Sequence, residues 1–313
     1  MSTARLRSSD RLFHVLTALA ASAVPVLLLV ITGIVAYAAW PALRDHGLTL
    51  FTGTEWDVPR QRFGALPAIV GTLLTSAMAL AIAAPIGVSV AIFVNEMAPR
   101  RIGTIVGVLV DLLAAIPSVV YGLWGIFVLL PWLRETVMPL LRDQLGLGAF
   151  SLFSGPAYGP SLLAATLVLA IMVLPYIAAV GREVLAAVPR AQREAALALG
   201  ATRWEMIRDA VLPAARSGLV GGVMLGLGRA LGETMAVTMV IGNRNALPDS
   251  LFAPAYSMAA LLANEFNEAT NDAHVSALMA VAGALLVIAL LVNALARLLV
   301  GSVTRRSGAP VTG

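Results

Sequence analysis

Six segments of this chain are long and apolar enough to cross a membrane, and no other feature restricts its fold as strongly. About 20 mostly apolar residues of α-helix span the hydrocarbon core of a bilayer. Irregular backbone and open sheet edges do not face lipid, because their polar groups would have no partners there. The sequence therefore predicts an all-α membrane protein with six transmembrane helices, at residues 13–40, 66–94, 102–131, 161–180, 218–242 and 274–300.

The composition agrees with this fold class and excludes several kinds of chemistry. Of the 313 residues, 59% are hydrophobic and 12% are charged, and a soluble domain of this size cannot bury that much apolar surface. Cysteine is absent and the three histidines lie far apart, so we expect no metal site. All 21 basic residues are arginines, so the chain lacks the P-loop lysine that binds ATP phosphates. We therefore expect that this chain is not an enzyme and has neither catalytic residues nor a cofactor. Its arginines are scattered over short loops, which does not indicate nucleic-acid binding.

The first apolar segment has two possible interpretations. Arg5, Arg7 and Arg11 precede it, and residues 36–38 (AYA) resemble a signal-peptidase cleavage site. Its uncharged apolar stretch is, however, about twice the length of the apolar region of a signal peptide, which favours an uncleaved anchor helix in contact with membrane lipid.

The arginines also indicate which side of the membrane each loop faces, because basic residues in short loops concentrate on the cytoplasmic side. If the N-terminus is inside, the inner segments contain fourteen arginines and the outer segments six. We therefore expect both termini in the cytoplasm. The inner arginines are Arg5, Arg7, Arg11, Arg100, Arg101, Arg182, Arg190, Arg193, Arg203, Arg208, Arg216, Arg297, Arg305 and Arg306; the outer ones are Arg44, Arg60, Arg62, Arg134, Arg142 and Arg244.

The longest inner loop, residues 181–218, is patterned as two short helices joined by a bend. Pro189 can begin the first helix, and Gly200 can end it. Thr202 and Glu205 form the pattern of a capping box for a second helix. We expect Pro213 to end that helix before the fifth transmembrane segment begins.

The first of these helices presents a small apolar face, with Ala195 and Ala196 next to charged residues. Such a face suits the docking of another protein. It equally suits an amphipathic helix that lies on lipid headgroups. The residues of the loop alone leave both possibilities open.

The run EAALALGATRWEMIRDAVLP (194–213) resembles the EAA loop of importer-type ABC permeases. Ala210 stands where that family has isoleucine, a packing position. The resemblance implies a coupling helix that inserts into a groove of a separate ATPase subunit, which binds ATP and Mg²⁺. The positions that match the family pattern are Glu194, Ala195, Ala196, Gly200, Leu212 and Pro213.

The fifth apolar segment contains two charges, Arg229 and Glu233, in a glycine-rich run. An arginine at the centre of a transmembrane helix costs about 2.5–3.5 kcal/mol on insertion scales, so such residues face a protein interior or a water-filled path. At about 100° per residue, both charges lie on one face of a helix. Gly218, Gly222 and Gly226 share that face, and glycines at this spacing allow a neighbouring helix to pack closely.

Two roles are open for this pair. Arg229 and Glu233 can neutralise each other and hold two helices in register. Alternatively, Arg229 donates bidentate hydrogen bonds to an oxyanion in transit, and Glu233 prevents it from binding too tightly. Both roles are compatible if the pair opens as the substrate passes.

The run GGVMLGLGRALGETMAVT (221–238) after LPAARSG (212–218) resembles the PstC-type permease subunits of phosphate ABC importers. The resemblance implies the importer-type ABC permease fold, with five core helices plus an N-terminal helix. It further implies a bacterial plasma-membrane importer for inorganic phosphate, with a PstA-type second permease subunit, PstB-type ATPase subunits and a PstS-type extracytoplasmic phosphate-binding protein. Further matching stretches are FGALPAIVGTLLTS (63–76), NEMAP (95–99), AIPSVVYGLWG (115–125) and LANEF (262–266).

On this basis residues 1–60 contain the N-terminal helix and an outer loop, residues 61–300 form the permease domain with its EAA loop at 181–217, and residues 301–313 form a cytoplasmic tail. Arg229 and Glu233 are then expected to line the substrate path. An importer of the same type for sulfate or molybdate is an alternative, as is an ion-coupled secondary carrier in which this pair relays protons.

Overall fold

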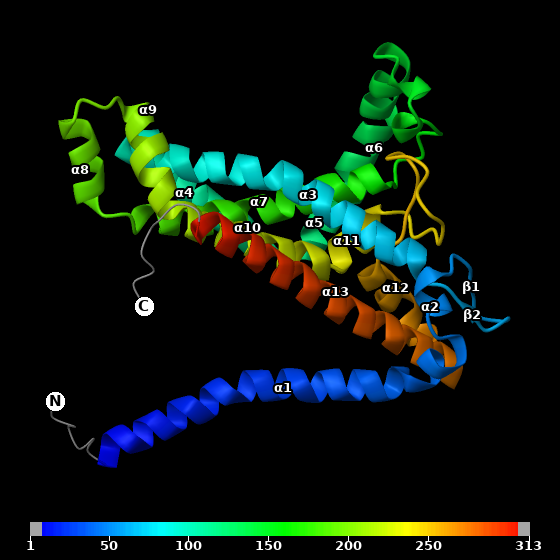
Figure 1. Cartoon of the computed structure of the whole chain (residues 1–313). Coiled ribbons are helices and arrows are strands. Elements are labelled where there is room, and N and C mark those ends of the chain that lie inside the picture. Colours follow the sequence, from blue (N-terminus) through cyan, green and yellow to red (C-terminus); the bar gives the residue numbers. More distant parts are fainter. Residues whose placement is uncertain (1–7, 306–313) are drawn as a thin grey trace.

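Long helices run side by side between the two ends of the molecule (Figure 1). The computed structural model describes residues 8–305. Its longest helices are α1 (Ser8–His46), α3 (Leu66–Ile92), α7 (Leu162–Ala186), α10 (Leu212–Gly232) and α13 (Asp272–Arg305).

Shorter elements connect these helices and form the two ends. The short helices are α2 (Thr49–Thr52), α4 (Arg100–Ala115), α5 (Ser118–Trp124), α6 (Leu130–Trp132), α8 (Arg190–Ala198), α9 (Arg203–Glu205), α11 (Met235–Val240) and α12 (Met258–Glu265). Strands β1 (Trp56–Asp57) and β2 (Arg62–Phe63) pair antiparallel. The chain forms π-helical turns at Phe93–Met97, Gly125–Leu129, Leu133–Val137, Leu140–Gln144 and Met206–Val211, and 3₁₀ turns at Leu147–Ala149, Ser151–Phe153 and Phe266–Glu268.

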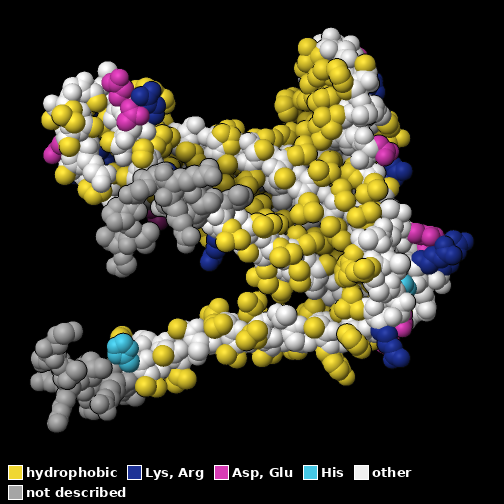
Figure 2. Space-filling view, in the orientation of Figure 1, with side chains coloured by type: hydrophobic (Ala, Val, Ile, Leu, Met, Phe, Trp, Pro, Cys, Tyr) yellow, Lys and Arg dark blue, Asp and Glu magenta, His cyan; other side chains and the backbone are white. Residues whose placement is uncertain are grey.

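Six helical segments of the described chain are long and apolar enough to cross a membrane, which is the predicted number. They are Phe13–His46, Leu66–Met97, Ser118–Gln144, Leu162–Ala186, Arg203–Gly232 and Asp272–Leu298. Figure 2 shows hydrophobic side chains along these helices, with charged side chains gathered near α8 and α9 and near β1 and β2. This distribution is the one that a multi-pass membrane protein requires.

The third predicted transmembrane helix, 102–131, is broken in the structure. Helix α4 ends at Ala115, and α5 begins at Ser118. The break follows from Pro117, because the residue before a proline is forced out of helical geometry. Ile116 is accordingly extended, with ψ 129°. Helices α4 and α5 follow one another from the α8 end of the molecule toward α6 (Figure 1). The third segment that is long and apolar enough to cross a membrane is therefore Ser118–Gln144, and the predicted bounds, 102–131, are wrong.

The prediction that Pro213 ends a helix is wrong. Helical structure continues from Arg203 through Pro213 to Gly232, although the turn before the proline, Met206–Val211, is π-helical. A proline within a helix lacks one N–H donor and clashes with the carbonyl four residues earlier. A wider π-turn relieves that conflict without ending the helix.

Helix α7 forms the centre of the bundle and packs against α3, α4, α10 and α11. Leu169, Val173 and Ile177 are among its fully buried side chains. A helix that is hydrophobic on all sides is stable only when other helices surround it or lipid covers it. Because α7 contacts so many elements, it is the fixed element against which the functional residues are placed.

Helix α1 stands apart from the rest of the bundle except near its C-terminal end. There Ala39 and Ala42 are buried beside Ala277 and Ala280 of α13. Small residues on both helices allow this close contact. Toward its N-terminus α1 diverges from α13, and its apolar side chains are exposed (Figure 1). The exposed apolar surface of α1 is suited to lipid.

Part of the predicted cytoplasmic tail, 301–313, belongs to a helix, since α13 continues to Arg305. Residues 306–313 lie outside the described part of the chain, and so do Arg5 and Arg7.

Gly71 on α3 is a position where the backbone of another segment approaches the helix. A Cβ at Gly71 would overlap the carbonyl oxygen of Tyr256. We expect Gly71→Ala to destabilise the chain by about 1–3 kcal/mol, the usual cost of overpacking. The effect is measured as a lower melting temperature of the purified protein in detergent.

Gly33→Ala is the matched control, because Gly33 is also helical but a Cβ there meets nothing within 4 Å. Both variants gain the same increase in helix propensity from alanine. Equal melting temperatures for the two variants would show that the Tyr256 carbonyl does not restrict position 71.

Candidate functional site

The bend between α8 and α9 is fixed by local hydrogen bonds, as the sequence predicted. Gly200 ends α8 with a left-handed backbone, φ +87°. The N–H groups of Gly200 and Ala201 donate to the carbonyls of Leu197 and Ala196, which is a Schellman motif. The predicted capping box between Thr202 and Glu205 is formed at the start of α9. The geometry of this bend therefore depends on a few neighbouring residues.

The residues of the EAA pattern lie on both sides of the bend. Ala196 and Leu212 are partly buried and pack against an apolar cluster that includes Met206 and Val211. Glu194, Ala195, Gly200 and Pro213 are exposed. The pattern therefore combines residues that attach the bend to the bundle with residues that face away from it.

Exposed apolar side chains surround the outward-facing residues of the bend. Leu199 is 90% exposed, and Trp204 is 59% exposed. Trp204 is not among the residues predicted for docking, although a tryptophan in a loop rich in charged residues is a signal for such a role. Large apolar groups exposed together on a charged surface mark sites where another molecule binds.

The glycines of the fifth segment face α7. A Cβ at Gly222 would lie 3.0 Å from Val180, and one at Gly226 would lie 2.9 Å from Val173 and Ile177. Gly218 is similarly placed against Val184. These contacts identify α7 as the helix that the glycines of α10 allow to approach closely.

Arg229 continues this face of α10 toward α7. Its guanidinium carbon lies 4.2 Å from the centre of the Tyr176 ring, a cation–π contact. Arg229 is half-buried, and its Nε is buried without a hydrogen-bond partner. Within the described part of the chain, no carboxylate lies within 4 Å of this guanidinium.

Glu233 does not lie on the same helical face as Arg229, so the predicted continuous stripe is wrong. Helix α10 ends at Gly232, and Glu233 is extended, with ψ 124°. Its Oε1 accepts a hydrogen bond of 3.3 Å from the N–H of Ala236, at the start of α11. A carboxylate at a helix N-terminus satisfies an otherwise unpaired amide. The glutamate therefore caps α11 and forms no ion pair with Arg229.

Arg182, another arginine of the bundle, has a carboxylate partner among the described residues, in contrast to Arg229. Its Nη2 donates to Oδ1 of Asp111, which joins α7 to α4. Asn95 also donates to the Arg182 carbonyl, at 2.9 Å. Arg182 is thus held by a carboxylate, whereas among the described residues Arg229 contacts the face of a tyrosine.

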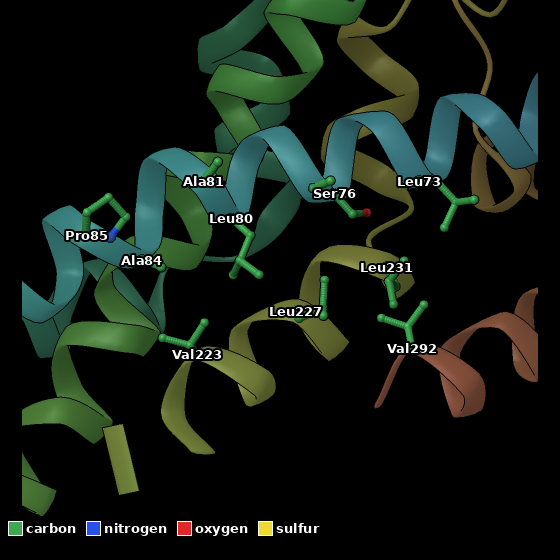
Figure 3. Close-up of a pocket in the computed structure, with 11 residues that line it drawn as sticks. Leu73, Ser76, Leu80, Ala81, Ala84, Pro85, Val223, Leu227, Leu231 and Val292 are labelled. Carbon is green, nitrogen blue, oxygen red and sulfur yellow. The ribbon is translucent and has the colours of Figure 1, made fainter. Parts of the chain in front are cut away.

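A cavity of about 540 Å³ lies between α3, α10 and α13 (Figure 3). Its walls are apolar side chains such as Leu80 and Leu227, and Ser76 supplies the only hydroxyl among the lining residues. Replacing the hydration of an anion requires several polar partners. This cavity therefore does not suit an oxyanion, and Arg229 is not among its lining residues.

Comparison with known proteins places the chain in a family. The family described as binding-protein-dependent transport system inner membrane component matches residues 83–305. The phosphate transport system permease protein PstC of Mesorhizobium japonicum is 45% identical over 97% of this chain and 94% of its own length. The protein of the same name from Haemophilus influenzae is 44% identical over 96% of this chain and 95% of its own length.

Solved structures show the fold. A bacterial alginate ABC transporter chain has a TM-score of 0.60 at 17% identity, covering 94% of this chain and 96% of that one. A chain of the MetNI methionine ABC transporter has a TM-score of 0.54 at 19% identity, covering 81% of this chain and 100% of that one. The chain is therefore a multi-pass membrane protein of the binding-protein-dependent transport system inner membrane component family, with the ABC importer permease fold and PstC proteins among its relatives.

Proposed function

We propose that this chain is the membrane-spanning permease subunit of an ATP-driven importer for inorganic phosphate. The observation that carries the proposal is Arg229, a half-buried guanidinium in an apolar helix that has no carboxylate partner among the described residues. Such an intramembrane cation is costly and is retained for function. The names of the PstC relatives support phosphate as the anion.

The contact with Tyr176 leaves Arg229 able to bind an anion. A guanidinium that stacks on a ring keeps its N–H donors at its edge, in a planar fork that matches a tetrahedral oxyanion. The negative charge of Glu233 lies four residues after Arg229, at the start of α11. We propose that this charge limits the affinity of the site, so that phosphate is released.

Coupling to ATP is assigned to the bend between α8 and α9. Glu194, Leu199 and Trp204 face away from the bundle there. We assign this surface to PstB-type ATPase subunits, which bind ATP and Mg²⁺; the chain itself has no lysine for a P-loop and needs no cofactor. This assignment places the bend and both termini in the cytoplasm, in agreement with the distribution of arginines.

The remaining partners follow from the same assignment. A PstA-type permease subunit completes the path, and a PstS-type binding protein delivers phosphate at the end of the molecule that carries β1 and β2. ATP binding moves the bend and opens the path outward, and hydrolysis resets it. The path thus opens alternately to the two sides of the membrane, and the separate ATPase subunits drive this change.

Uptake of radiolabelled phosphate into proteoliposomes that contain the assembled complex tests the proposal. We expect uptake to require ATP on the side of the membrane where the ATPase subunits lie. We expect unlabelled phosphate to compete with the radiolabelled phosphate, and sulfate and molybdate not to compete. Equal competition by sulfate would make the chain a permease for another oxyanion. Uptake by this chain alone without ATP would show an ion-coupled carrier instead.

A further inference from the structure

Arg193 of α8 uses all three nitrogens of its guanidinium to bind two other parts of the bundle. Its Nη2 and Nε donate to the carboxylate of Glu96, at 2.6 and 3.1 Å. Its Nη2 also donates to the Leu185 carbonyl at 2.8 Å, and its Nη1 donates to the Val188 carbonyl at 2.5 Å. One side chain of α8 is thereby fixed to the π-helical turn that follows α3 and to the end of α7.

Burial distinguishes this ion pair from the others in the loop. The Glu96 side chain is 4% exposed, and that of Arg193 is 19% exposed. In the neighbouring pair, Arg208 and Asp209, both side chains are 58% exposed. Exposed pairs contribute little, whereas removing one partner of a buried pair leaves an uncompensated charge.

Glu96 lies in an unusual piece of backbone that directly follows α3. It belongs to the π-helical turn Phe93–Met97, and Asn95 of the same turn donates to the Arg182 carbonyl of α7. Helix α3 packs along α7 for much of its length. A displacement of this turn is therefore transmitted to the helices that enclose the centre of the bundle.

We infer that Arg193 and Glu96 form a clamp that transmits movement of the docking helix α8 to the inner end of α3. The inference rests on the proposed function, since it requires that an ATPase moves α8. Arg193 is a positioning residue: it contacts neither ATP nor phosphate, and it keeps α8 and α3 in one rigid unit. Without the clamp, α8 remains joined to the bundle through the chain on either side of it, but it no longer displaces α3.

The test compares phosphate uptake with ATP hydrolysis in the same proteoliposomes. Arg193→Lys keeps the charge but cannot form the planar fork, and Glu96→Gln keeps the shape but loses the charge. For both variants we expect hydrolysis within about twofold of the intact complex and uptake reduced at least about fivefold, because a lost bidentate pair weakens the connection and leaves the docking surface in place. The matched control is Arg208→Lys, for which both rates stay within about twofold of the intact complex.

A second measurement keeps the inference testable if complexes with Arg193→Lys or Glu96→Gln assemble poorly. This chain has no cysteine, so a short, reducible bifunctional thiol reagent can link the double variant Glu96→Cys, Arg193→Cys without competition from other thiols of the chain. We expect linking to restore uptake per ATP hydrolysed, reduction to abolish it again, and neither treatment to affect the two single-cysteine variants.

The outcomes separate the inference from the proposed function. Proportional loss of uptake and hydrolysis in Arg193→Lys, with no recovery on linking, would show that the pair only stabilises the fold. An intact complex that hydrolyses ATP without moving phosphate would overturn the proposed function itself.

Discussion

Arg229→Gln is expected to lower phosphate uptake by the assembled complex by at least about 100-fold. Glutamine removes the positive charge and the two-pronged donor edge. Hydrogen bonds to charged groups contribute about 1.5–3 kcal/mol each, and each 1.4 kcal/mol corresponds to about tenfold in binding. Losing two such bonds to the anion gives the expected factor. The measurement is the initial rate of uptake over a range of phosphate concentrations.

Arg229→Lys and Tyr176→Phe refine this prediction. Lysine retains the charge as a point donor, so we expect an intermediate loss. Phenylalanine retains the ring face that contacts the guanidinium at 4.2 Å, so we expect uptake near that of the intact chain. Tyr176→Leu removes the ring and is expected to weaken apparent phosphate affinity.

Arg134→Gln is the matched control for the loss of an arginine. The Arg134 side chain is 57% exposed, and it pairs with Glu135, whose side chain is 64% exposed, in the turn Leu133–Val137. Such surface pairs contribute about 0–1 kcal/mol. If Arg229→Gln transports phosphate as well as this control does, then Arg229 has a structural role and the path lies elsewhere.

The bend at Gly200 could be predicted from the sequence because its causes are local. A glycine at the end of a helix, and a threonine followed three residues later by a glutamate, determine their own hydrogen bonds. The number of membrane-crossing segments was also predictable, because it depends only on length and apolar content.

The helix breaks were harder to predict, although both had local signals. Pro117 indicated a bend, but whether a proline kinks or ends a helix depends on the neighbouring helices that replace the lost hydrogen bond. The apolar run predicts one unbroken helix, in which Glu233, four residues after Arg229, shares its face. The preference of Glu233 for capping α11, next to Gly232, opposes continuation of the helix, and hydropathy contains no information about that competition.

The contacts that define the candidate site could not be predicted from one sequence. Arg193 and Glu96 are 97 residues apart, and neither stands out from the other charges of the inner loops. Similarly, no local pattern indicates that the ring on which Arg229 lies belongs to Tyr176. Such pairs depend on how α3, α7 and α10 pack together, which periodicity alone does not specify.

Glu194→Arg is expected to abolish ATP-coupled phosphate uptake while the chain still reaches the membrane. Glu194 is exposed on α8 beside Ala195, in the surface assigned to the ATPase. A large cation there replaces a carboxylate and adds bulk where a close fit requires small residues. Mismatched charge at an interface costs several kcal/mol, so loss of uptake should accompany loss of ATPase subunits from the purified complex.

The same variant separates docking from the alternative in which α8 lies on lipid headgroups. An added arginine strengthens the attraction of an amphipathic helix to anionic lipid by about 1 kcal/mol, so the lipid interpretation predicts unchanged or improved function. Glu268→Arg, at an exposed position outside the bend, controls for the charge change itself. Because docking and lipid binding predict opposite results for Glu194→Arg, full uptake with a retained ATPase would remove the basis for assigning the bend to coupling.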